Sequence, residues 1–303
     1  MIVAELSRPQ LARHLSGRGL RLRTGPVVAR IESRIPSVVE GIGLHYARHT
    51  VVDEQTFADF HVCVARPRSA RRWFKPQVRL YVDGRSPFAP LPFDQAFPML
   101  EWGLNWCVSA HCHQYLIIHA AVVERSGRAL ILPAPPGSGK STLTAALVHR
   151  GWRLLSDELT LIEPESCRVV PIPRPVSLKN GSIAAIRAFA PAAEIGVPVR
   201  DTVKGTVAHM RAPHDEPLAS LRTIEPHWVV FPRYEASAAS QMTPVPKALA
   251  FMQVADQAFN YTIHGRRGFD VLATLIDRCA CRSLEFGELA AAVAAVDSLA
   301  RAS

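Results

Sequence analysis

Short apolar runs alternate with turn-forming residues along the first third of the chain. Stretches rich in Val, Ile, Phe and Tyr occur at 27–31, 57–64 and 78–82, and Pro, Gly and Asp separate them. Runs of this length are too short for helices and are typical of strands joined by turns. The pattern predicts antiparallel strands in a β-rich N-terminal domain over residues 1–90.

A helical period follows a proline-rich linker at 87–92. Within 94–113 the apolar residues recur every three or four positions, which places them on one face of a helix. Two further apolar runs, 116–123 and 129–132, are separated by a Ser-Gly turn and predict two strands. These segments begin the second domain that the pattern predicts, over residues 91–303.

The rest of the second domain alternates between strand and helix patterns. Residues 141–150 favour a helix, whereas 153–162 and 228–231 read as buried strands. Residues 164–217 have no sustained period, which indicates loops with short elements. Three more helices are predicted, at 246–258, 269–279 and 288–300. We expect an α/β fold.

Composition indicates a folded protein of two domains but does not indicate which reaction it could catalyse. The 303 residues, 48% hydrophobic and 20% charged, suit a folded chain of two domains. The formal net charge of +9 favours polyanionic partners. The six cysteines lack the spacing of a disulfide framework, and neither a signal peptide nor a long apolar span is apparent. We therefore expect a cytoplasmic protein without a membrane partner.

The most specific chemical signal lies between the strand at 129–132 and the helix at 141–150. A turn that contains glycine and leads into Gly-Lys-Ser at a helix start is the Walker A arrangement. Backbone N–H groups surround phosphate oxygens, the lysine reaches the β- and γ-phosphates, and the next hydroxyl binds Mg²⁺. The residues that carry the signal are Gly137, Ser138, Gly139, Lys140, Ser141 and Thr142. They predict binding of ATP or another nucleoside triphosphate.

One feature of this loop departs from the Walker A pattern. The pattern has glycine six residues before the lysine, where this chain has Ala134 followed by Pro135 and Pro136. Proline has no backbone N–H to donate. We therefore expect the phosphate donors to come only from the second half of the loop, residues 137–142.

Two acids and a histidine flank the loop in sequence. Asp157 and Glu158 stand in the strand predicted after the loop helix, where carboxylates could hold Mg²⁺ and accept the proton of an attacking hydroxyl. His119 interrupts an otherwise apolar strand before the loop. If the two strands are neighbours, its imidazole can reach the terminal phosphate. Taken alone, His119 is better explained as a buried structural histidine, and the acids could also be an exposed pair at a strand end.

The segments 118–120, 134–141 and 151–158 together resemble the catalytic core of the bacterial HPr kinase/phosphorylase family, and more closely the HPr-kinase-related kinases. In that family a His-Gly pair precedes the loop, and an Ala-Asp-Asp sequence follows the loop helix. The similarity covers about residues 116–162. It implies a P-loop kinase core similar to phosphoenolpyruvate carboxykinase, a mixed sheet with helices, following the β-rich N-terminal domain.

The resemblance also implies a role for each matching residue. His119 falls on the phosphate-proximal histidine of the family, and Lys140 and Ser141 fall on its Walker A lysine and serine. Asp157 falls on the acid that acts as base toward a serine hydroxyl. Glu158 replaces a second aspartate that is associated with the metal. ATP and Mg²⁺ are the cofactors that this match implies.

The acceptor that follows from the resemblance is a hydroxyl. Relatives in peptide-modification systems phosphorylate a precursor peptide, so we expect ATP-dependent transfer to a Ser or Thr of a protein or peptide. The family's second, glycine-rich signature is not recognisable in 164–217, so neither the reverse reaction nor HPr itself is implied. Family members are often oligomeric, which leaves a homo-oligomer open.

Other functions remain compatible with these residues. A module that binds nucleotide without transferring phosphate, or a kinase acting on a small molecule, would carry the same loop. The basic stretch 66–75 has aromatic residues beside cations, as nucleic-acid surfaces do, but no nucleic-acid motif accompanies it.

Two further groups of residues carry weaker signals. Cys107, His111, Cys112 and His113 include zinc-ligand types without the spacing of a finger, and we expect no metal there. The four later cations that could assist at the phosphates, although each is expected at the surface, are Arg174, Lys179, Lys204 and Arg211.

Overall fold

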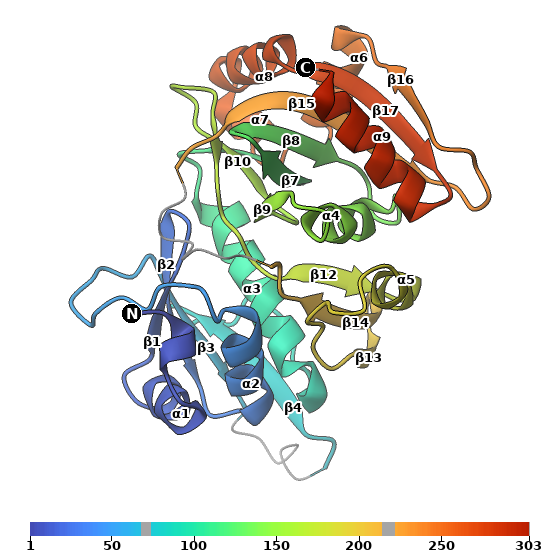
Figure 1. Cartoon of the computed structure of the whole chain (residues 1–303). Helices are drawn as coiled ribbons and strands as arrows, with labels where there is room; N and C mark the ends of the chain where they lie inside the picture. Colours follow the sequence, from blue (N-terminus) through green and yellow to red (C-terminus); the bar gives the residue numbers. More distant parts are fainter. Residues whose placement is uncertain (68–73, 214–221, 303) are drawn as a thin grey trace.

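Two lobes, each with its own large β-sheet, are stacked along the length of the molecule (Figure 1). The computed structural model describes residues 1–67, 74–213 and 222–302. Most of the basic stretch at 66–75 therefore lies outside the described residues. The architecture is mixed α/β, as the apolar pattern predicts, with helices packed against several sheets.

The lower lobe contains a five-stranded sheet whose strands follow one another in chain order. They are β1 (Leu20–Thr24), β2 (Val27–Ser33), β3 (Phe60–Ala65), β4 (Gln77–Val82) and β5 (Leu91–Pro92). Burial alternates along β1, β3 and β4, so one face of the sheet lies against the core. The three strands predicted in this region are thereby confirmed.

The expectation that these strands are antiparallel is wrong at one pair. β2 and β3 are parallel, whereas the other neighbours are antiparallel. The chain between them forms helix α2 (Pro36–His45), and a crossover of this kind is what parallel strands require. The apolar pattern also missed a 3-10 turn, η1 (Val3–Glu5), and helix α1 (Arg8–Ser16). The N-terminal region is therefore less purely β than expected.

Helix α3 (Ala96–His111) confirms the helix predicted at 94–113. A 3-10 turn, η3 (Phe93–Gln95), leads into it. Its apolar face, which includes Leu100 and Leu104, packs into the core of the lower lobe against β3 and β4. Figure 1 shows α3 rising from this lobe toward the upper one, so it can contribute side chains to the region between them.

The upper lobe is built on a six-stranded sheet. Its order is β16 (Gln241–Pro244), β17 (Ala280–Phe286), β15 (Glu225–Tyr234), β8 (Arg128–Pro133), β7 (Ala120–Arg125) and β9 (Arg153–Ser156). β15 is parallel to both of its neighbours, and the remaining pairs are antiparallel. β15 contains the strand predicted at 228–231, whereas β17 lies where no strand is predicted.

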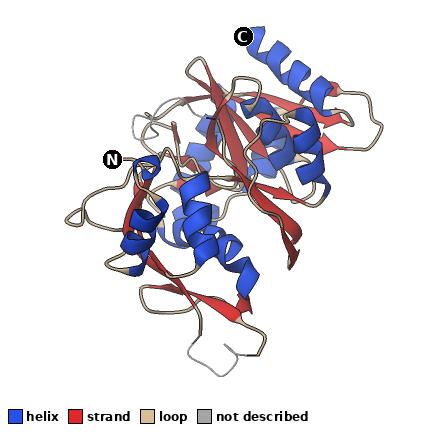
Figure 2. Cartoon of the chain, turned by 60° about the horizontal axis from the view of Figure 1, so that its bottom comes forward, coloured by secondary structure: helices blue, strands red, loops and turns tan. Residues whose placement is uncertain are grey.

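Helices cover both faces of the six-stranded sheet (Figure 2). Leu130 and Leu132 of β8 share a core with helices α4 and α9, and Ile131 between them packs in the core of α6 and α8. A strand buried on both faces reads as a continuous apolar run. The helices are α4 (Lys140–Val148), α6 (Lys247–Ala255), α7 (Tyr261–His264), α8 (Arg266–Arg278) and α9 (Leu289–Arg301). Four of them confirm the predictions at 141–150, 246–258, 269–279 and 288–300.

Each of the single strands predicted at 116–123 and 153–162 is instead a pair of strands in different sheets. The first divides into β6 and β7 at His119, and the second into β9 and β10 after Ser156. The new strands are β6 (Leu116–Ile118), β10 (Thr160–Ile162) and β11 (Val169–Val170), a separate sheet in the order β11-β10-β6. Hydrophobic runs do not reveal such a break, because every strand on either side of it is buried.

A third small sheet occupies the segment for which the sequence predicts mainly loops. It consists of β12 (Val176–Lys179), β14 (Gly205–Met210) and β13 (Val199–Thr202), with helix α5 (Gly181–Phe189). Figure 1 shows this unit between the lobes, beside α4. The short strands and the register shift between β13 and β14 account for the weak period in the sequence.

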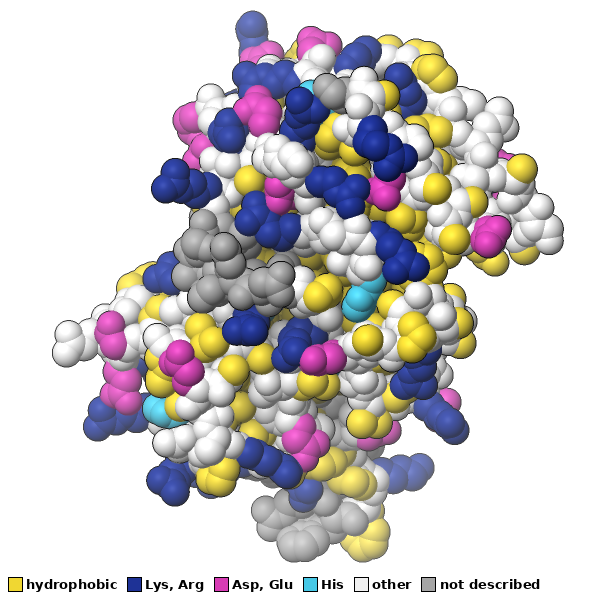
Figure 3. Space-filling view, in the orientation of Figure 1, with side chains coloured by type: hydrophobic (Ala, Val, Ile, Leu, Met, Phe, Trp, Pro, Cys, Tyr) yellow, Lys and Arg dark blue, Asp and Glu magenta, His cyan; other side chains and the backbone are white. Residues whose placement is uncertain are grey.

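Three features concern both lobes. Across residues 1–67, 74–213 and 222–302, none of the helices combines the length and apolar character that crossing a bilayer needs. All six cysteines are free thiols, and five of them are buried. Figure 3 shows Lys and Arg side chains dispersed among Asp and Glu over both lobes on the face that it draws.

A buried ion pair joins the segment before β12 to the lower lobe. Arg174, which was expected at the surface, is only 8% exposed and donates to Glu101 Oε2 over 2.7 Å. It also donates to Asn105 Oδ1 over 2.7 Å, and Tyr46 donates to Glu101 Oε1 over the same distance. The surface expectation for Arg174 is wrong because α3 supplies a matching carboxylate. The contact fixes β12 relative to the lower lobe.

Arg174→Ala is expected to lower the free energy of unfolding by about 3–5 kcal/mol, because Glu101 would remain buried without its cation. Urea denaturation followed by circular dichroism measures this loss. The control is Arg8→Ala, which removes an ion pair with Glu40 between two largely exposed side chains and should change stability little. Equal losses in the two variants would contradict a stabilising role for the buried pair.

Candidate functional site

The loop at 134–139 runs from the end of β8 to the start of α4, where the sequence predicts it. Gly137 and Gly139 have φ angles of 90° and 84°, a left-handed conformation that glycine adopts without strain. The backbone N–H of Tyr234, at the end of β15, donates to Ser138 O over 2.9 Å. The loop is therefore shaped by its glycines and attached to the neighbouring parallel strand.

The N-terminus of α4 opens onto this loop. Gly139 is its N-cap and provides no side-chain hydrogen bond, so the first N–H groups, including those of Ser141 and Thr142, can serve an anion. The side chain of Lys140 is 7% exposed, and its Nζ has no hydrogen-bond partner among the described residues. Burial lowers the pKa of Lys140 despite the nearby charges of Glu158 and Asp157. A buried lysine without a partner, beside free N–H groups, suits an anionic ligand.

His119 and the acidic pair meet at the junction of two sheets. β7 pairs with β9 in the six-stranded sheet, and β6 pairs with β10 in the smaller sheet; both pairs are antiparallel. The chain passes from one sheet to the other between β6 and β7, and again between β9 and β10. As a result, His119, between β6 and β7, lies opposite residues 157–159, between β9 and β10. His119 Nε2 lies 3.4 Å from Glu158 Oε2. Asp157 and Glu158 therefore lie in the turn between β9 and β10, and not within a strand as predicted.

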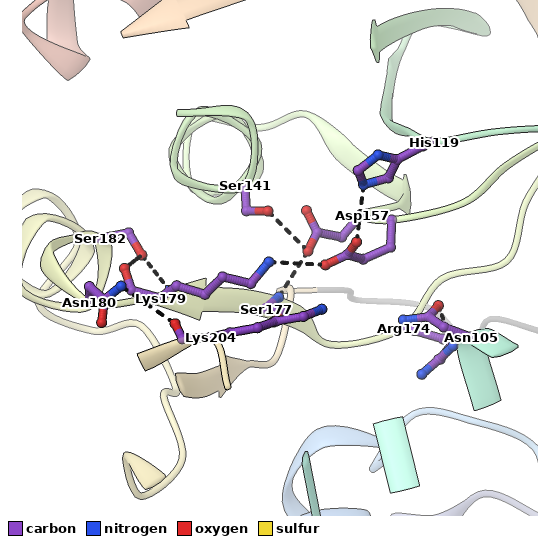
Figure 4. A network of polar contacts seen from close by, with 11 residues as sticks. Asn105, His119, Ser141, Asp157, Arg174, Ser177, Lys179, Asn180, Ser182 and Lys204 are labelled. Atoms are coloured by element: carbon purple, nitrogen blue, oxygen red, sulfur yellow. Dashed lines mark hydrogen bonds and ion pairs between the residues drawn. The ribbon is translucent and has the colours of Figure 1, made fainter. Parts of the chain in front are cut away.

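Asp157 is buried at the centre of the group, with 3% of its surface exposed. Its Oδ2 accepts from the backbone N–H of Ser177 over 2.9 Å and from Ser141 Oγ over 3.3 Å (Figure 4). Its Oδ1 has no partner among the described residues. Burial and the adjacent Glu158 raise the pKa of Asp157 to about 6. The carboxylate is held at one oxygen and free to accept a proton at the other.

Glu158 has the opposite electrostatic environment. Burial by itself raises its pKa, but the hydrogen bond from His119 and the charges of Lys179 and Lys140 outweigh burial, so the pKa lies below its usual value. Lys179 Nζ is 3.5 Å from Glu158 Oε1. The two adjacent carboxyls therefore differ: Glu158 stays ionised, and Asp157 changes its charge near neutral pH.

Two of the later cations reach the site. Figure 4 shows Lys179, from β12, and Lys204, from the turn before β14, extending toward the acids from the same side. Burial and the charge of Lys179 lower the pKa of Lys204. The surface expectation is wrong for Lys179, which is half-buried because β12 packs against α4. Lys204 is exposed, as expected. Arg211 instead pairs with Glu194, away from the acids.

The residues proposed for Mg²⁺ offer oxygen atoms of the kind it binds. Ser141 Oγ lies beside Asp157, whereas Glu158 is engaged by His119 and Lys179. In the described ranges no three His, Cys, Asp or Glu side chains converge as a metal site. Mg²⁺ at nucleotide sites uses one or two protein oxygens together with phosphates and water, so a hydroxyl beside carboxylates fits it.

A pocket adjoins the acids on the side of the lower lobe. Its cavity volume is about 20 Å³, it is partly open to solvent, and it is lined by Asp157, Glu158 and side chains from α3, β12 and β14. The α3 and β14 residues include Trp102, Asn105 and His209. The sequence analysis missed these residues, as well as Ser177. No motif marks them, because they come from segments far apart in the sequence.

Comparison with known proteins leaves the chain without an assigned family. No protein-family model matches the sequence, and no curated protein matches it. The argument about function therefore depends on the geometry of the site. That geometry brings together His119, Lys140, Ser141, Asp157 and Glu158, while the loop residues Gly137, Ser138, Gly139 and Thr142 lie at the start of α4.

The two loop glycines provide a matched test of the backbone geometry. A Cβ added to Gly139 would lie 2.9 Å from Tyr234 Cβ and 3.0 Å from Phe286 Cζ, whereas one added to Gly137 meets nothing within 4 Å. Both alanine variants place a side chain at positive φ, at a cost of about 1–2 kcal/mol. Gly139→Ala should lose a further 1–3 kcal/mol or so from the clash. Urea unfolding measures the difference, and equal losses would contradict the packed loop.

The pKa of Asp157 predicts how stability depends on pH. The folded chain binds this proton more tightly than the unfolded chain, in which the pKa is near 3.8, so ionised Asp157 costs stability above pH 6. Asp157→Asn should therefore be more stable than the wild type at pH 8. Its advantage should shrink as the pH falls from 6 to 4. Urea midpoints at pH 4, 6 and 8 measure the trend.

An exposed aspartate serves as the control for this pH series. The N–H groups of Gln55 and Thr56 lower the pKa of Asp53, so its ionised form stabilises the fold above its usual pKa. Asp53→Asn should gain nothing at pH 8. If the two asparagine variants follow the same trend, the raised pKa of Asp157 is wrong.

Proposed function

We propose that this protein is an ATP-dependent kinase that transfers the γ-phosphate to a hydroxyl, most readily a Ser or Thr of a protein or peptide. The observation that carries the proposal is the environment of Asp157. A buried carboxylate with one free oxygen and a pKa near 6 adjoins the hydroxyl of Ser141 at the open N-terminus of a helix. A general base works best when its pKa is close to the working pH.

The nucleotide phosphates would bind at the N-terminus of α4. Its free N–H groups and its dipole favour negative charge. Lys140, buried and without a hydrogen-bond partner among the described residues, would contact the β- and γ-phosphates. The negative charge of a bound phosphate would favour the protonated amine, so binding should raise the pKa of Lys140, which burial lowers. Gly137 and Gly139 let the backbone approach the phosphates.

The acceptor hydroxyl would lie beside Asp157 Oδ1. Its oxygen forms a bond to the γ-phosphorus, the bond from that phosphorus to the β,γ-bridging oxygen breaks, and the hydroxyl proton moves to Asp157. ADP leaves with the electron pair of the broken bond. Phosphoryl transfer depends mainly on positioning and on neutralising charge, so a small set of residues is sufficient.

Cations around the carboxylates would complete the site. Lys179, Lys204 and His119 adjoin Glu158, which they keep ionised, and they lie where the terminal phosphate would approach. Ser141 and Glu158 would hold Mg²⁺, with Asp157 beside them. Mg²⁺, when bound, neutralises charge on the phosphate oxygens.

The resemblance of the segments 118–120, 134–141 and 151–158 to the HPr-kinase-related kinases also supports this reaction. We propose that the segment 91–303 is a P-loop kinase core of the phosphoenolpyruvate carboxykinase type. The mixed sheet with helices on both faces and the loop between β8 and α4 are compatible with such a core. The N-terminal 1–90 unit would then be an addition to the kinase, and α3 of the 91–303 segment packs in the core of that lower lobe.

Two substitutions separate nucleotide binding from transfer. Lys140→Ala should weaken ATP binding and abolish transfer, because the γ-phosphate loses its buried cation. Asp157→Asn should retain ATP affinity and lose about 10²- to 10⁴-fold in transfer rate, the usual contribution of a general base. Isothermal titration with an ATP analogue measures affinity, and labelled phosphate from [γ-³²P]ATP measures transfer into a host extract.

Arg266→Ala, which removes a cation whose side chain is 93% exposed on α8, is the control and should behave as wild type. Wild-type transfer by Asp157→Asn would overturn the assignment of the base. Tight ATP binding by the wild type without any labelled product would instead indicate a nucleotide-dependent binding module. Label in a metabolite would indicate a small-molecule kinase.

A further inference from the structure

Four buried polar atoms without hydrogen-bond partners among the described residues belong to side chains that line one pocket. Asp157 Oδ1, Ser177 Oγ and His209 Nε2 belong to the upper lobe and the third sheet. Trp102 Nε1 belongs to α3 of the lower lobe. More than nine-tenths of buried polar groups in folded proteins have a partner, so four exceptions around one space indicate a polar ligand.

These atoms differ in the hydrogen bonds that they can make. The indole N–H of Trp102 can only donate, and ionised Asp157 can only accept. The Ser177 hydroxyl can do both. Burial lowers the pKa of His209 to about 3, so its ring is neutral at physiological pH and offers one donor and one acceptor. A ligand that satisfies them must carry several donors and acceptors close together, and it needs no net charge.

The walls of the pocket further restrict the ligand. Leu159, Ile172 and Pro175 line it with apolar surface, and the Arg174–Glu101 pair closes the side toward the lower lobe. That arginine is neutralised by its own partner and is not available to bind an anion. Lys204 Nζ lies 5.3 Å from the ring centre of Trp102, which connects α3 to the cations around Glu158.

We propose that this pocket binds the phosphate acceptor, and that the acceptor is an aliphatic alcohol flanked by further hydrogen-bonding groups. A Ser or Thr between peptide amides and a small polyol share this chemistry. The inference rests on the proposed kinase function and identifies its second substrate. Trp102, Ser177 and His209 position the alcohol so that its O–H points to Asp157 Oδ1. The lower lobe is then a wall of the acceptor site.

The transfer step balances with these groups. The alcohol oxygen bonds to the γ-phosphorus of ATP as the bond to the β,γ-bridging oxygen breaks. The alcohol proton passes to Asp157, and ADP departs. The ring N–H of Trp102 remains bound to a neighbouring polar group of the acceptor throughout, so it determines affinity and orientation and does not take part in proton transfer.

Trp102→Phe and Ser177→Ala test the pocket, since each removes one hydrogen-bonding group, and Trp106→Phe controls for the ring volume that Trp102→Phe also removes. The probes are peptides with a single Ser, Thr or Tyr in an otherwise randomised sequence, together with free serine and glycerol, each with [γ-³²P]ATP. Both variants should raise the KM for the accepted alcohol about tenfold, the effect of one lost hydrogen bond, and leave ATP affinity unchanged. Label in a peptide or in a small alcohol distinguishes the two sources.

Trp106→Phe is the matched control, because Trp106 lies on the same helix but packs against Phe88 and His111, outside the pocket. It should leave the acceptor KM unchanged. If transfer to Ser or Thr occurs but Trp102→Phe and Ser177→Ala keep the wild-type KM, the pocket is not the acceptor site and the kinase proposal still stands. Label confined to Tyr peptides would overturn the alcohol class. Absence of transfer to every probe would overturn both proposals.

Discussion

The site depends on one constraint: two neighbouring chain segments, at 119 and at 157–159, leave one β-sheet and enter another side by side. β7 and β9 belong to the six-stranded sheet, whereas their continuations β6 and β10 belong to a separate one. At that junction the strand pairing stops, so polar side chains can occupy buried positions between the sheets. His119 and the two acids lie there, close to the N-terminus of α4. Without the break, Asp157 would point into an apolar core and lose its contact with Ser177.

The two adjacent carboxyls at this junction differ in pKa because different groups surround them. Asp157 receives two hydrogen bonds from the described residues and is almost wholly buried, which favours its protonated form. Glu158 lies against His119 and Lys179, which favour its charge. Pairs of titratable groups whose environments separate their pKa values are typical of acid–base sites. The free energy that ionised Asp157 costs the fold is compatible with a functional role, since active sites often reduce stability.

The lower lobe contributes to this site through α3. The buried Arg174–Glu101 pair fixes the segment that leads into β12, and β12 supplies both Ser177, which holds Asp157, and Lys179, which holds Glu158. Trp102 on the same helix lines the pocket beside the acids. The lobes are therefore joined where the chemistry is proposed, and a change in the N-terminal region can alter the site without touching the phosphate loop.

Periodicity in the sequence was sufficient to predict the strands β2, β3 and β4 and five helices, which depend on local propensity and on the burial of one face. The helices are α3, α4, α6, α8 and α9. The Walker A motif and the resemblance, and not periodicity, selected His119, Lys140, Ser141, Asp157 and Glu158. Only the tertiary structure decided the break at the sheet junction, the parallel pairing of β2 with β3, and the approach of Lys179, Lys204 and Trp102 to the acids. The strands before and after the break are equally apolar, so the sequence does not show where one sheet ends. The direction of β3 relative to β2 depends on the segment that connects them. Contacts between residues distant in sequence leave no local period, so no pattern along the chain could have predicted them.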